Sequence, residues 1–130
     1  MTGDRFMGYP WLEEYCVSKK GAAKELKEEW GAIRYTVGGK MFAMQGNDGT
    51  GRPIITLKLV PAEGLLLRGQ YEDITAGYYM NKDHWNSLYL DGSVPEDVLR
   101  DMIDKSYAIL FDSLPKKVQN EIKQAAHLKP

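Results

Sequence analysis

The stretch Asn81-Lys-Asp-His84-Trp85-Asn-Ser-Leu-Tyr-Leu-Asp91-Gly92-Ser-Val-Pro95 decides the fold, because it contains a strand, a tight turn and the start of a helix in that order. Successive side chains of a strand point to opposite faces of the sheet. One face therefore carries His84, Asn86, Leu88 and Leu90, and the other carries Trp85, Ser87 and Tyr89. Residues 93–96 have the spacing of a capping box, in which Ser93 caps the helix and Glu96 reaches back to it.

Upstream of this stretch, residues 32–45 predict a β-hairpin. Apolar residues alternate with polar or small ones, and Gly38-Gly39 supplies a two-residue loop whose positive φ glycine adopts without steric cost. This loop pairs Tyr35 with Phe42 and Ile33 with Met44, and cross-strand partners share a face. The predicted inner face is Ile33, Tyr35, Val37, Phe42 and Met44, with Lys40 at its rim. The predicted outer face is Arg34, Thr36, Met41, Ala43 and Gln45.

The remaining pattern predicts three helical regions and two more strand regions around the hairpin. The helices lie between Pro10 and Gly21, after Pro61, and after Pro95, where a shorter terminal helix over 116–126 follows the main one. The two strands cover 54–60 and 77–80. The order α-β(3)-α-β(2)-α predicts an α+β fold, a two-layer α/β sandwich with an antiparallel sheet of about five strands. Its helices lie on one face and leave the second face open. No repeat or linker occurs, so we interpret residues 1–130 as one domain.

The composition is that of an ordinary globular domain. Hydrophobic residues make up 43% and charged residues 27% of the 130 residues, enough for a core without disulfides. Seventeen basic and eighteen acidic side chains give a net charge of −1, which argues against binding nucleic acid by bulk charge but not against a local basic patch. A single cysteine, Cys16, and the lack of an apolar leader or spanning segment predict a cytoplasmic protein without membrane association.

No constellation of residues predicts catalysis or metal binding. The two histidines, His84 and His127, lie far apart in the sequence, and no zinc-type spacing occurs. His84 and Ser87 have the residue types of a base and a nucleophile, but they point to opposite faces of one strand. The glycine-rich run 46–51 joins two strands instead of opening a helix, so it matches neither nucleotide-binding fingerprint. We therefore expect no catalytic residue, no metal site and no cofactor.

Five fragments, in order along the chain, resemble the MmcQ/YjbR-like family. They are Tyr15-Cys16, Gly39-Lys40-Met41-Phe42-Ala43, Leu57-Lys58-Leu59, the run from Gly77 to Pro95, and Ser106-Tyr107 with Leu114-Pro115-Lys116. The resemblance extends from residue 12 to residue 117 and implies a CyaY-like, or secretion-chaperone-like, α/β sandwich. It also implies a DNA-binding role, through a proposed "double wing" likeness, and it implies neither enzymatic activity nor a cofactor.

The outer face of the sheet is the candidate binding surface. Aromatic side chains interleaved with basic ones can stack bases and hold phosphates, and the same mixture suits a protein partner. The candidate contacts are Arg34, Lys40, Lys58, Lys82, His84, Trp85 and Tyr89. Two alternatives remain, a non-enzymatic domain that binds DNA, as the family resemblance implies, and a protein-interaction or chaperone-like module. We expect a monomer or a weak dimer.

The charged segment 19–29 leaves the exposure of this face undecided. Residues 22–26 form either a short strand or an extended approach to the sheet. In one alternative, this segment and the N-terminal arm cover Trp85 and Tyr89. In the other, both aromatic side chains are free to meet a ligand.

Overall fold

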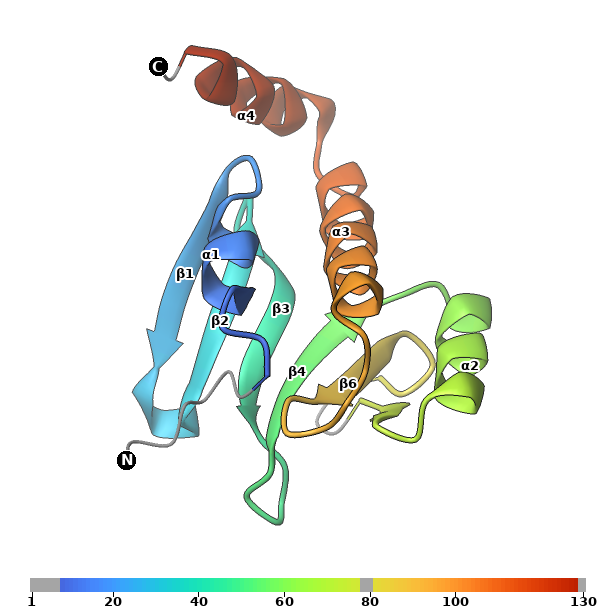
Figure 1. Ribbon diagram of the computed structural model, residues 1–130. Coiled ribbons are helices and arrows are strands. Elements are labelled where there is room, and N and C mark those ends of the chain that lie inside the picture. Colours follow the sequence, from blue (N-terminus) through green and yellow to red (C-terminus); the bar gives the residue numbers. More distant parts are fainter. Residues whose placement is uncertain (1–7, 78–80, 129–130) are drawn as a thin grey trace.

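Six strands form one antiparallel sheet in the order β1-β2-β3-β4-β6-β5. The computed structural model (Figure 1) describes the backbone of residues 8–77 and 81–128 and the side chains of residues 8–77 and 81–125. The strands are β1 Ala22–Lys27, β2 Ala32–Val37, β3 Lys40–Asn47, β4 Pro53–Lys58, β5 Ile74–Ala76 and β6 Trp85–Tyr89. Each neighbouring pair is antiparallel.

The helices collect on one face of this sheet, so the predicted two-layer α+β architecture is confirmed (Figure 1). They are α1 Leu12–Val17, α2 Pro61–Gln70, α3 Glu96–Asp112 and α4 Lys116–Leu128. A short 3₁₀ helix, η1 Glu28–Trp30, follows β1 and borders the other face. Helix α3 packs on β2, β3 and β4, α1 lies against β1, and α2 lies against β5. Among the described residues, no helix combines the length and apolar composition needed to cross a membrane.

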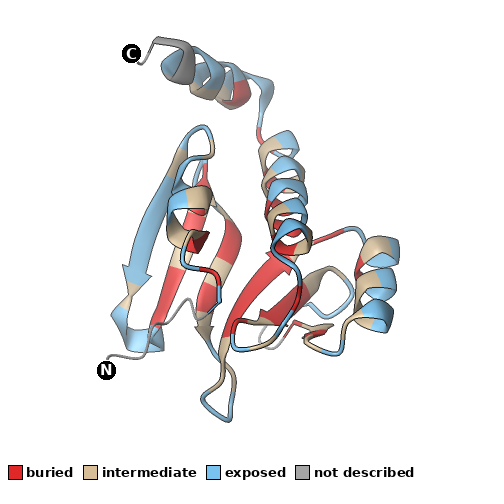
Figure 2. Ribbon diagram, in the orientation of Figure 1, coloured by how far each residue is buried: buried red, intermediate tan, exposed pale blue. Residues whose placement is uncertain are grey.

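The core lies between α3, α1 and the inner face of the sheet (Figure 2). Helix α3 buries one stripe at helical spacing, as its sequence pattern predicts. Its buried members are Leu99, Met102, Ile103, Ser106 and Leu110. The sheet contributes Tyr35, Phe42, Ile55, Leu57 and Leu88, all of them fully buried. The predicted inward positions of β4 and β6 are therefore confirmed.

The pairing of β2 with β3 differs from the predicted register, because a β-bulge shifts it. Thr36 pairs with Met41, but Tyr35 pairs with Ala43, so Phe42 is an extra residue on β3. Beyond the bulge the two faces of β3 are exchanged relative to the prediction. Ala43 and Gln45 face the core, whereas Met44, paired with Arg34, faces outward.

The number of strands and the start of α3 also differ from the predictions. The additional strand is β1, which uses the charged segment whose conformation the sequence left undecided. The strand preceding β6 is Ile74–Ala76 instead of residues 77–80, of which 78–80 lie outside the described residues. The capping box is wrong, because Pro95 is the N-cap residue of α3 and makes no side-chain cap bond, while the Ser93 amide donates to Asp73 Oδ2 at 3.2 Å.

The position of β1 decides what covers the aromatic side chains of β6. Strands β2, β3 and β4 separate β1 from β6 in the sheet. Segment 19–29 therefore does not cover Trp85 or Tyr89, and that part of the prediction is wrong. Both side chains are half-buried, and the N-terminal arm that the same prediction invoked includes residues 1–7, outside the described residues.

Candidate functional site

The outer face of the sheet, called the open face here, contains one continuous cross-strand row, of which Thr56 and Ser87 are buried. The register places Arg34 of β2 beside Met44 of β3, Met44 beside Thr56 of β4, and Thr56 beside Ser87 of β6. The hydroxyl oxygens of Thr56 and Ser87 lie 2.9 Å apart and share a hydrogen bond. This row connects the residues that the sequence placed on the outer face with Met44, which the bulge turns outward.

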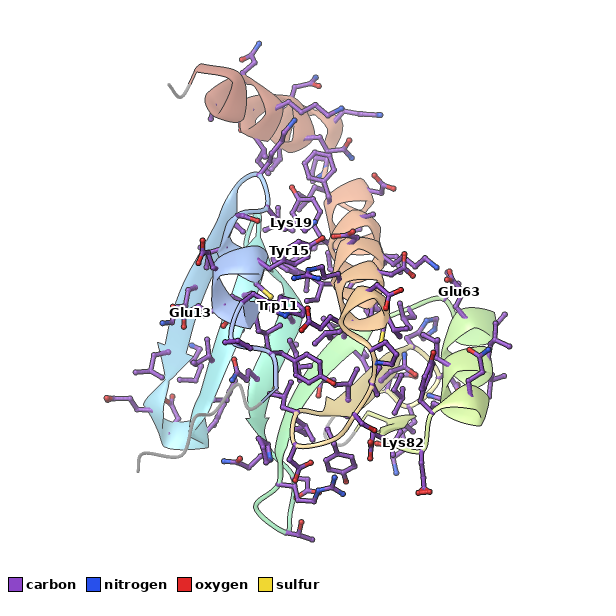
Figure 3. The ribbon with its side chains drawn as sticks, viewed as in Figure 1. Trp11, Glu13, Tyr15, Lys19, Glu63 and Lys82 are labelled. Carbon is purple, nitrogen blue, oxygen red and sulfur yellow. The ribbon has the colours of Figure 1, made fainter. Side chains whose placement is uncertain are left out.

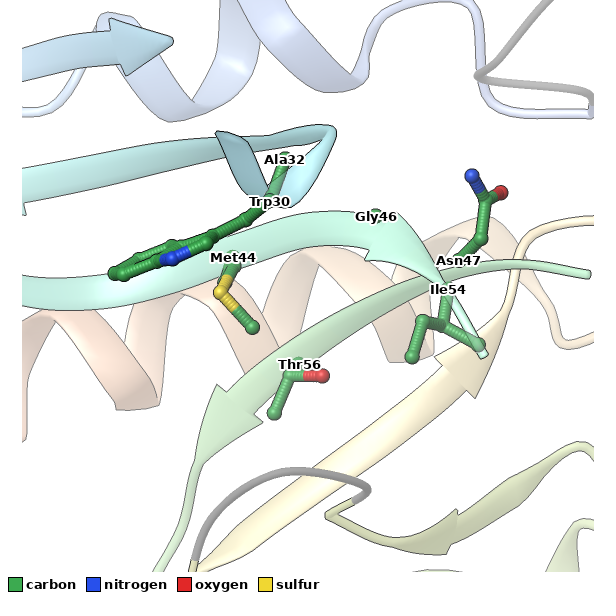
Figure 4. Close-up of a pocket in the computed structure, with 7 residues that line it drawn as sticks. All are labelled: Trp30, Ala32, Met44, Gly46, Asn47, Ile54 and Thr56. Atoms are coloured by element: carbon green, nitrogen blue, oxygen red, sulfur yellow. The ribbon is translucent and has the colours of Figure 1, made fainter. Parts of the chain in front are cut away.

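A hollow of about 440 Å³ lies on the open face between η1 and β4. Figure 4 shows the residues that line it, which are Trp30, Ala32, Met44, Gly46, Asn47, Ile54 and Thr56. Its floor is buried, since Ile54 is only 2% exposed, whereas Trp30 at its edge is 60% exposed. None of the lining side chains is ionisable, so the hollow can hold an apolar group but offers no acid or base.

Lys58 and Trp85 form a cation–aromatic pair further along the same face. They are cross-strand partners on β4 and β6, and Lys58 Nζ lies 5.9 Å from the centroid of the Trp85 ring. Both side chains are half-buried. A lysine over an indole ring is held by the negative face of the ring, so the positive charge stays on the open face.

Tyr89 takes part in holding the turn between β3 and β4. Its hydroxyl donates to Asp48 Oδ2 at 2.8 Å, and the Arg52 guanidinium lies 3.6 Å from the centre of its ring. Hydrogen bonds from the Thr50 side chain, the Tyr89 hydroxyl and two backbone amides hold the pKa of Asp48 below its usual range. The bond to Asp48 raises the pKa of Tyr89. Tyr89 therefore has a structural partner for its hydroxyl, and only its ring remains for a ligand.

Arg34 lies on the open face, but its charge is shared with a neighbour. Its Nη1 is 3.4 Å from Glu25 Oε1, and Glu25 also lies 3.3 Å from Lys27 Nζ. Arg34 Nε is buried and has no hydrogen-bond partner among the described residues. On this part of the face two cations therefore share the carboxylate of Glu25.

The other predicted contacts do not lie with this group. Lys40 extends on the helix side, where its Nζ lies 3.1 Å from Ser113 Oγ. Lys82 is exposed in the turn before β6, where its carbonyl accepts from Arg68 (Figure 3). His84 ends that turn, and its carbonyl accepts the Leu59 amide at 2.8 Å. The structure thus brings Arg34, Lys58, Trp85 and Tyr89 to one face and leaves the other three outside it.

Sequence reasoning missed the residues that make the hollow. Trp30 belongs to a charged segment without a clear periodicity, and Met44 was assigned to the core because the bulge was not foreseen. The alternation of β4 does place Ile54 and Thr56 outward, so the sequence predicts the orientation of two of the seven lining residues. In the part of the chain that the structure describes, no three His, Cys, Asp or Glu side chains lie close enough to hold a metal ion.

The fold and this face together define a class of protein, a two-layer α+β domain with one face of its sheet covered by helices and the other open. The chain belongs to the YjbR family, since the model of that family matches residues 17–109. The chain is 35% identical over 106 residues to the uncharacterised protein YjbR of Escherichia coli K12, covering 82% of this chain and 89% of that protein. It is 33% identical to the uncharacterised protein YyaQ of Bacillus subtilis, covering 76% and 80%.

Solved structures show the same fold. A Deinococcus radiodurans protein, DR2400, with the family-model domain DUF419, superposes with a TM-score of 0.79 at 23% identity, over 92% of this chain and 90% of that one. A Pseudomonas syringae protein gives a TM-score of 0.70 at 20% identity, over 80% and 99%. These likenesses support the α+β architecture, while the CyaY-like likeness and the DNA-binding label stay predictions.

Proposed function

We propose that this YjbR-family domain is a non-enzymatic binding module that holds an apolar side chain of a polypeptide partner in the hollow of its open face. The observation that carries the proposal is the hollow itself, with a buried floor at Ile54 and an exposed indole, Trp30, at its edge. Tryptophan and arginine dominate the binding energy of protein interfaces. An apolar hollow lined by an exposed tryptophan, with Arg34 as the cross-strand neighbour of its lining residue Met44, has the composition of such a contact.

Two cations of the open face, Arg34 and Lys58, favour an acidic flank on the partner on the side of the hollow away from Glu28 and Glu29 of η1. Lys27 and Arg34 share the single carboxylate of Glu25, and no acidic partner of Lys58 is recorded among the described residues. Opposite potentials across an interface speed association and fix its register. We expect the bound segment to carry one bulky apolar residue with Asp or Glu beside it.

DNA binding is the alternative that the family resemblance implies. It requires several cations to follow one phosphate backbone, yet Lys40 lies on the helix side and Lys82 in a separate turn. Only the Lys58–Trp85 pair has the arrangement of a base-stacking contact with a nearby charge. Because the cations are dispersed, we favour a polypeptide partner over DNA. The experiment below also tests DNA binding.

The test selects random peptides on the immobilised domain by phage display and titrates one enriched peptide into ¹⁵N-labelled protein. We expect the enriched peptides to share an apolar residue flanked by acids, and the amide shifts to centre on Met44, Ile54 and Thr56. Trp30→Ala should weaken binding about tenfold or more, since hot-spot truncations exceed ~1.4 kcal/mol. Leu65→Ala is the matched control, because Leu65 is 65% exposed on α2, away from the hollow.

Two outcomes would contradict the proposal. The first is a peptide that binds wild type and Trp30→Ala equally, or that shifts amides elsewhere. The second comes from titrating a short DNA duplex and its single strand in low salt. If DNA shifts the open-face amides, with an affinity that falls steeply with salt and with Lys58→Gln, the polypeptide proposal is replaced by DNA binding.

A further inference from the structure

Strand β1 is the edge of the sheet. It pairs with β2 on one side, and no other described strand pairs with its outer side. Figure 2 shows it exposed along most of its length. An edge strand presents a row of free backbone N–H and C=O groups that another strand can pair with. What that strand could be depends on the side chains of β1.

The charges on the two sides of Leu26 are opposite in sign at equal distances from it. The run is Lys24-Glu25-Leu26-Lys27-Glu28. When an identical strand pairs antiparallel with Leu26 opposite Leu26, each Glu25 comes opposite a Lys27 of the other copy. Glu25 and Lys27 both lie on the open face, as their partners Arg34 and Ala32 on β2 do. Two opposite-charge cross-strand pairs therefore form, one on each side of the two-fold axis.

Other registers centred within this run pair like charges. When two copies of one strand pair antiparallel, the open faces of both sheets stay on the same side only if the two-fold axis passes through a residue and not between two residues. An axis at Lys24 sets lysine against lysine, and an axis at Glu25 sets glutamate against glutamate. Charges of one sign would protect this edge against pairing, whereas the alternating order selects the register about Leu26.

An exposed apolar side chain lies at this same edge. Leu26 is 58% exposed on the helix side of β1, beside Ile33. In the register about Leu26 the two leucines face each other. Pairing would thus cover apolar surface that the single chain leaves in water.

We propose that two copies of this chain pair antiparallel through β1, centred on Leu26, and join their sheets into one. The occupant of the edge is a second copy, because the charge pattern complements itself. The paired residues 25–27 do not line the hollow of the open face, so this inference stands without the polypeptide partner. The overlap is short, so the dimer is expected to be weak and reversible.

The test measures oligomeric state by sedimentation velocity over a concentration series. Wild type should shift from monomer to dimer as concentration rises. Lys27→Glu puts Glu25 against a new glutamate twice, and Glu25→Lys puts lysine against lysine twice. Each variant should raise the dimer dissociation constant about tenfold or more. Mixing the two variants restores both opposite-charge pairs, so the mixture should form a heterodimer of wild-type strength.

The controls separate pairing from folding. Lys117→Glu on α4 makes the same change of charge at an exposed position outside the paired residues 25–27, and it should leave the dimer intact. Amide spectra of each variant report whether the fold is kept, and the mixing experiment needs no further variant, because a misfolded chain would not regain dimerisation. A wild type that stays monomeric at every concentration overturns the proposal. So does a Lys27→Glu variant that dimerises like wild type, or a mixture that stays monomeric.

Discussion

The hydroxyl of Ser106 lies between β3 and β4, just beyond the end of their hydrogen-bonded ladder. The β3–β4 ladder ends at Ala43 and Leu57, and the next pair would be Phe42 and Lys58. Instead, Ser106 Oγ donates to the Phe42 carbonyl at 2.6 Å and accepts from the Lys58 amide at 2.8 Å. A hydroxyl both donates and accepts. One side chain of α3 therefore provides the hydrogen-bond partner of a β3 carbonyl and of a β4 amide at the bulge.

Ser106→Ala should lower the free energy of unfolding by about 1–3 kcal/mol, because it leaves a buried carbonyl and a buried amide without their partner. Chemical denaturation of both proteins measures the difference. Ser18→Ala is the control, since its hydroxyl bonds the Tyr15 carbonyl at an exposed site, and its effect should stay within about 0.5 kcal/mol. Equal stability of wild type and Ser106→Ala would show that water takes over both bonds.

At the scale of elements, the docking of α2 depends on one glycine. A Cβ on Gly64 would lie 2.7 Å from Asn86 Oδ1, the same atom that accepts from Arg68 Nη1 at 2.7 Å. Asn86 is fully buried on the helix side of β6. The helix therefore approaches the sheet closely over Gly64, and Arg68, one turn later, satisfies the buried amide oxygen.

Gly64→Ala should destabilise the protein by about 1–3 kcal/mol through overpacking, a loss that exceeds the helix-propensity gain of at most about 1 kcal/mol. Gly69→Ala is the matched control on the same helix, because nothing lies within 4 Å of its Cβ position. That substitution should stabilise by about 0.5–1 kcal/mol. Thermal unfolding measures the stability of both variants. Stabilisation by Gly64→Ala as well as by Gly69→Ala would mean that α2 shifts freely on the sheet.

The sequence-based fold and site were correct where local alternation decides and wrong where strand pairing does. Trp85 and Tyr89 lie outward and Leu88 and Leu90 inward as alternation along one strand requires. Gln45 faces the core and Met44 faces outward, the reverse of the prediction, because the bulge arises from the pairing of β3 with β2. Gln45 is tolerated in the core, where its amide oxygen lies 3.4 Å from the Tyr35 hydroxyl. No local signal in the sequence places that bulge.

At the scale of the whole molecule, Cys16 reports on the contact of α1 with the rest of the fold. Its side chain is fully buried, and burial raises the pKa of the thiol to about 12. Helix α1 is also tied to α3, because the Tyr15 hydroxyl donates to Asp104 at 2.7 Å and Lys19 bridges to the same carboxylate (Figure 3). The thiol is therefore withdrawn from water and from its reactive ionised form.

Cys16 should resist Ellman's reagent in the native protein near neutral pH and react only as the whole chain unfolds. Labelling followed over increasing denaturant should track the unfolding transition measured by circular dichroism. Fully denatured protein is the control, and it should react at the rate of a free thiol. Rapid labelling of the native protein would show instead that α1 opens by itself, and Tyr15→Phe would then accelerate it further.

The sequence by itself determined the local features of this protein, namely the helices, the Gly38-Gly39 hairpin, the inward and outward sides of β4 and β6, and the family to which the chain belongs. Only the tertiary structure decided that segment 22–27 is the edge strand β1, that Met44 faces outward, and that Trp30 borders a hollow with Ile54. The physical reason is that alternation and turn chemistry act within a few residues. Strand order, bulges and shared surfaces arise from contacts between residues far apart in the chain.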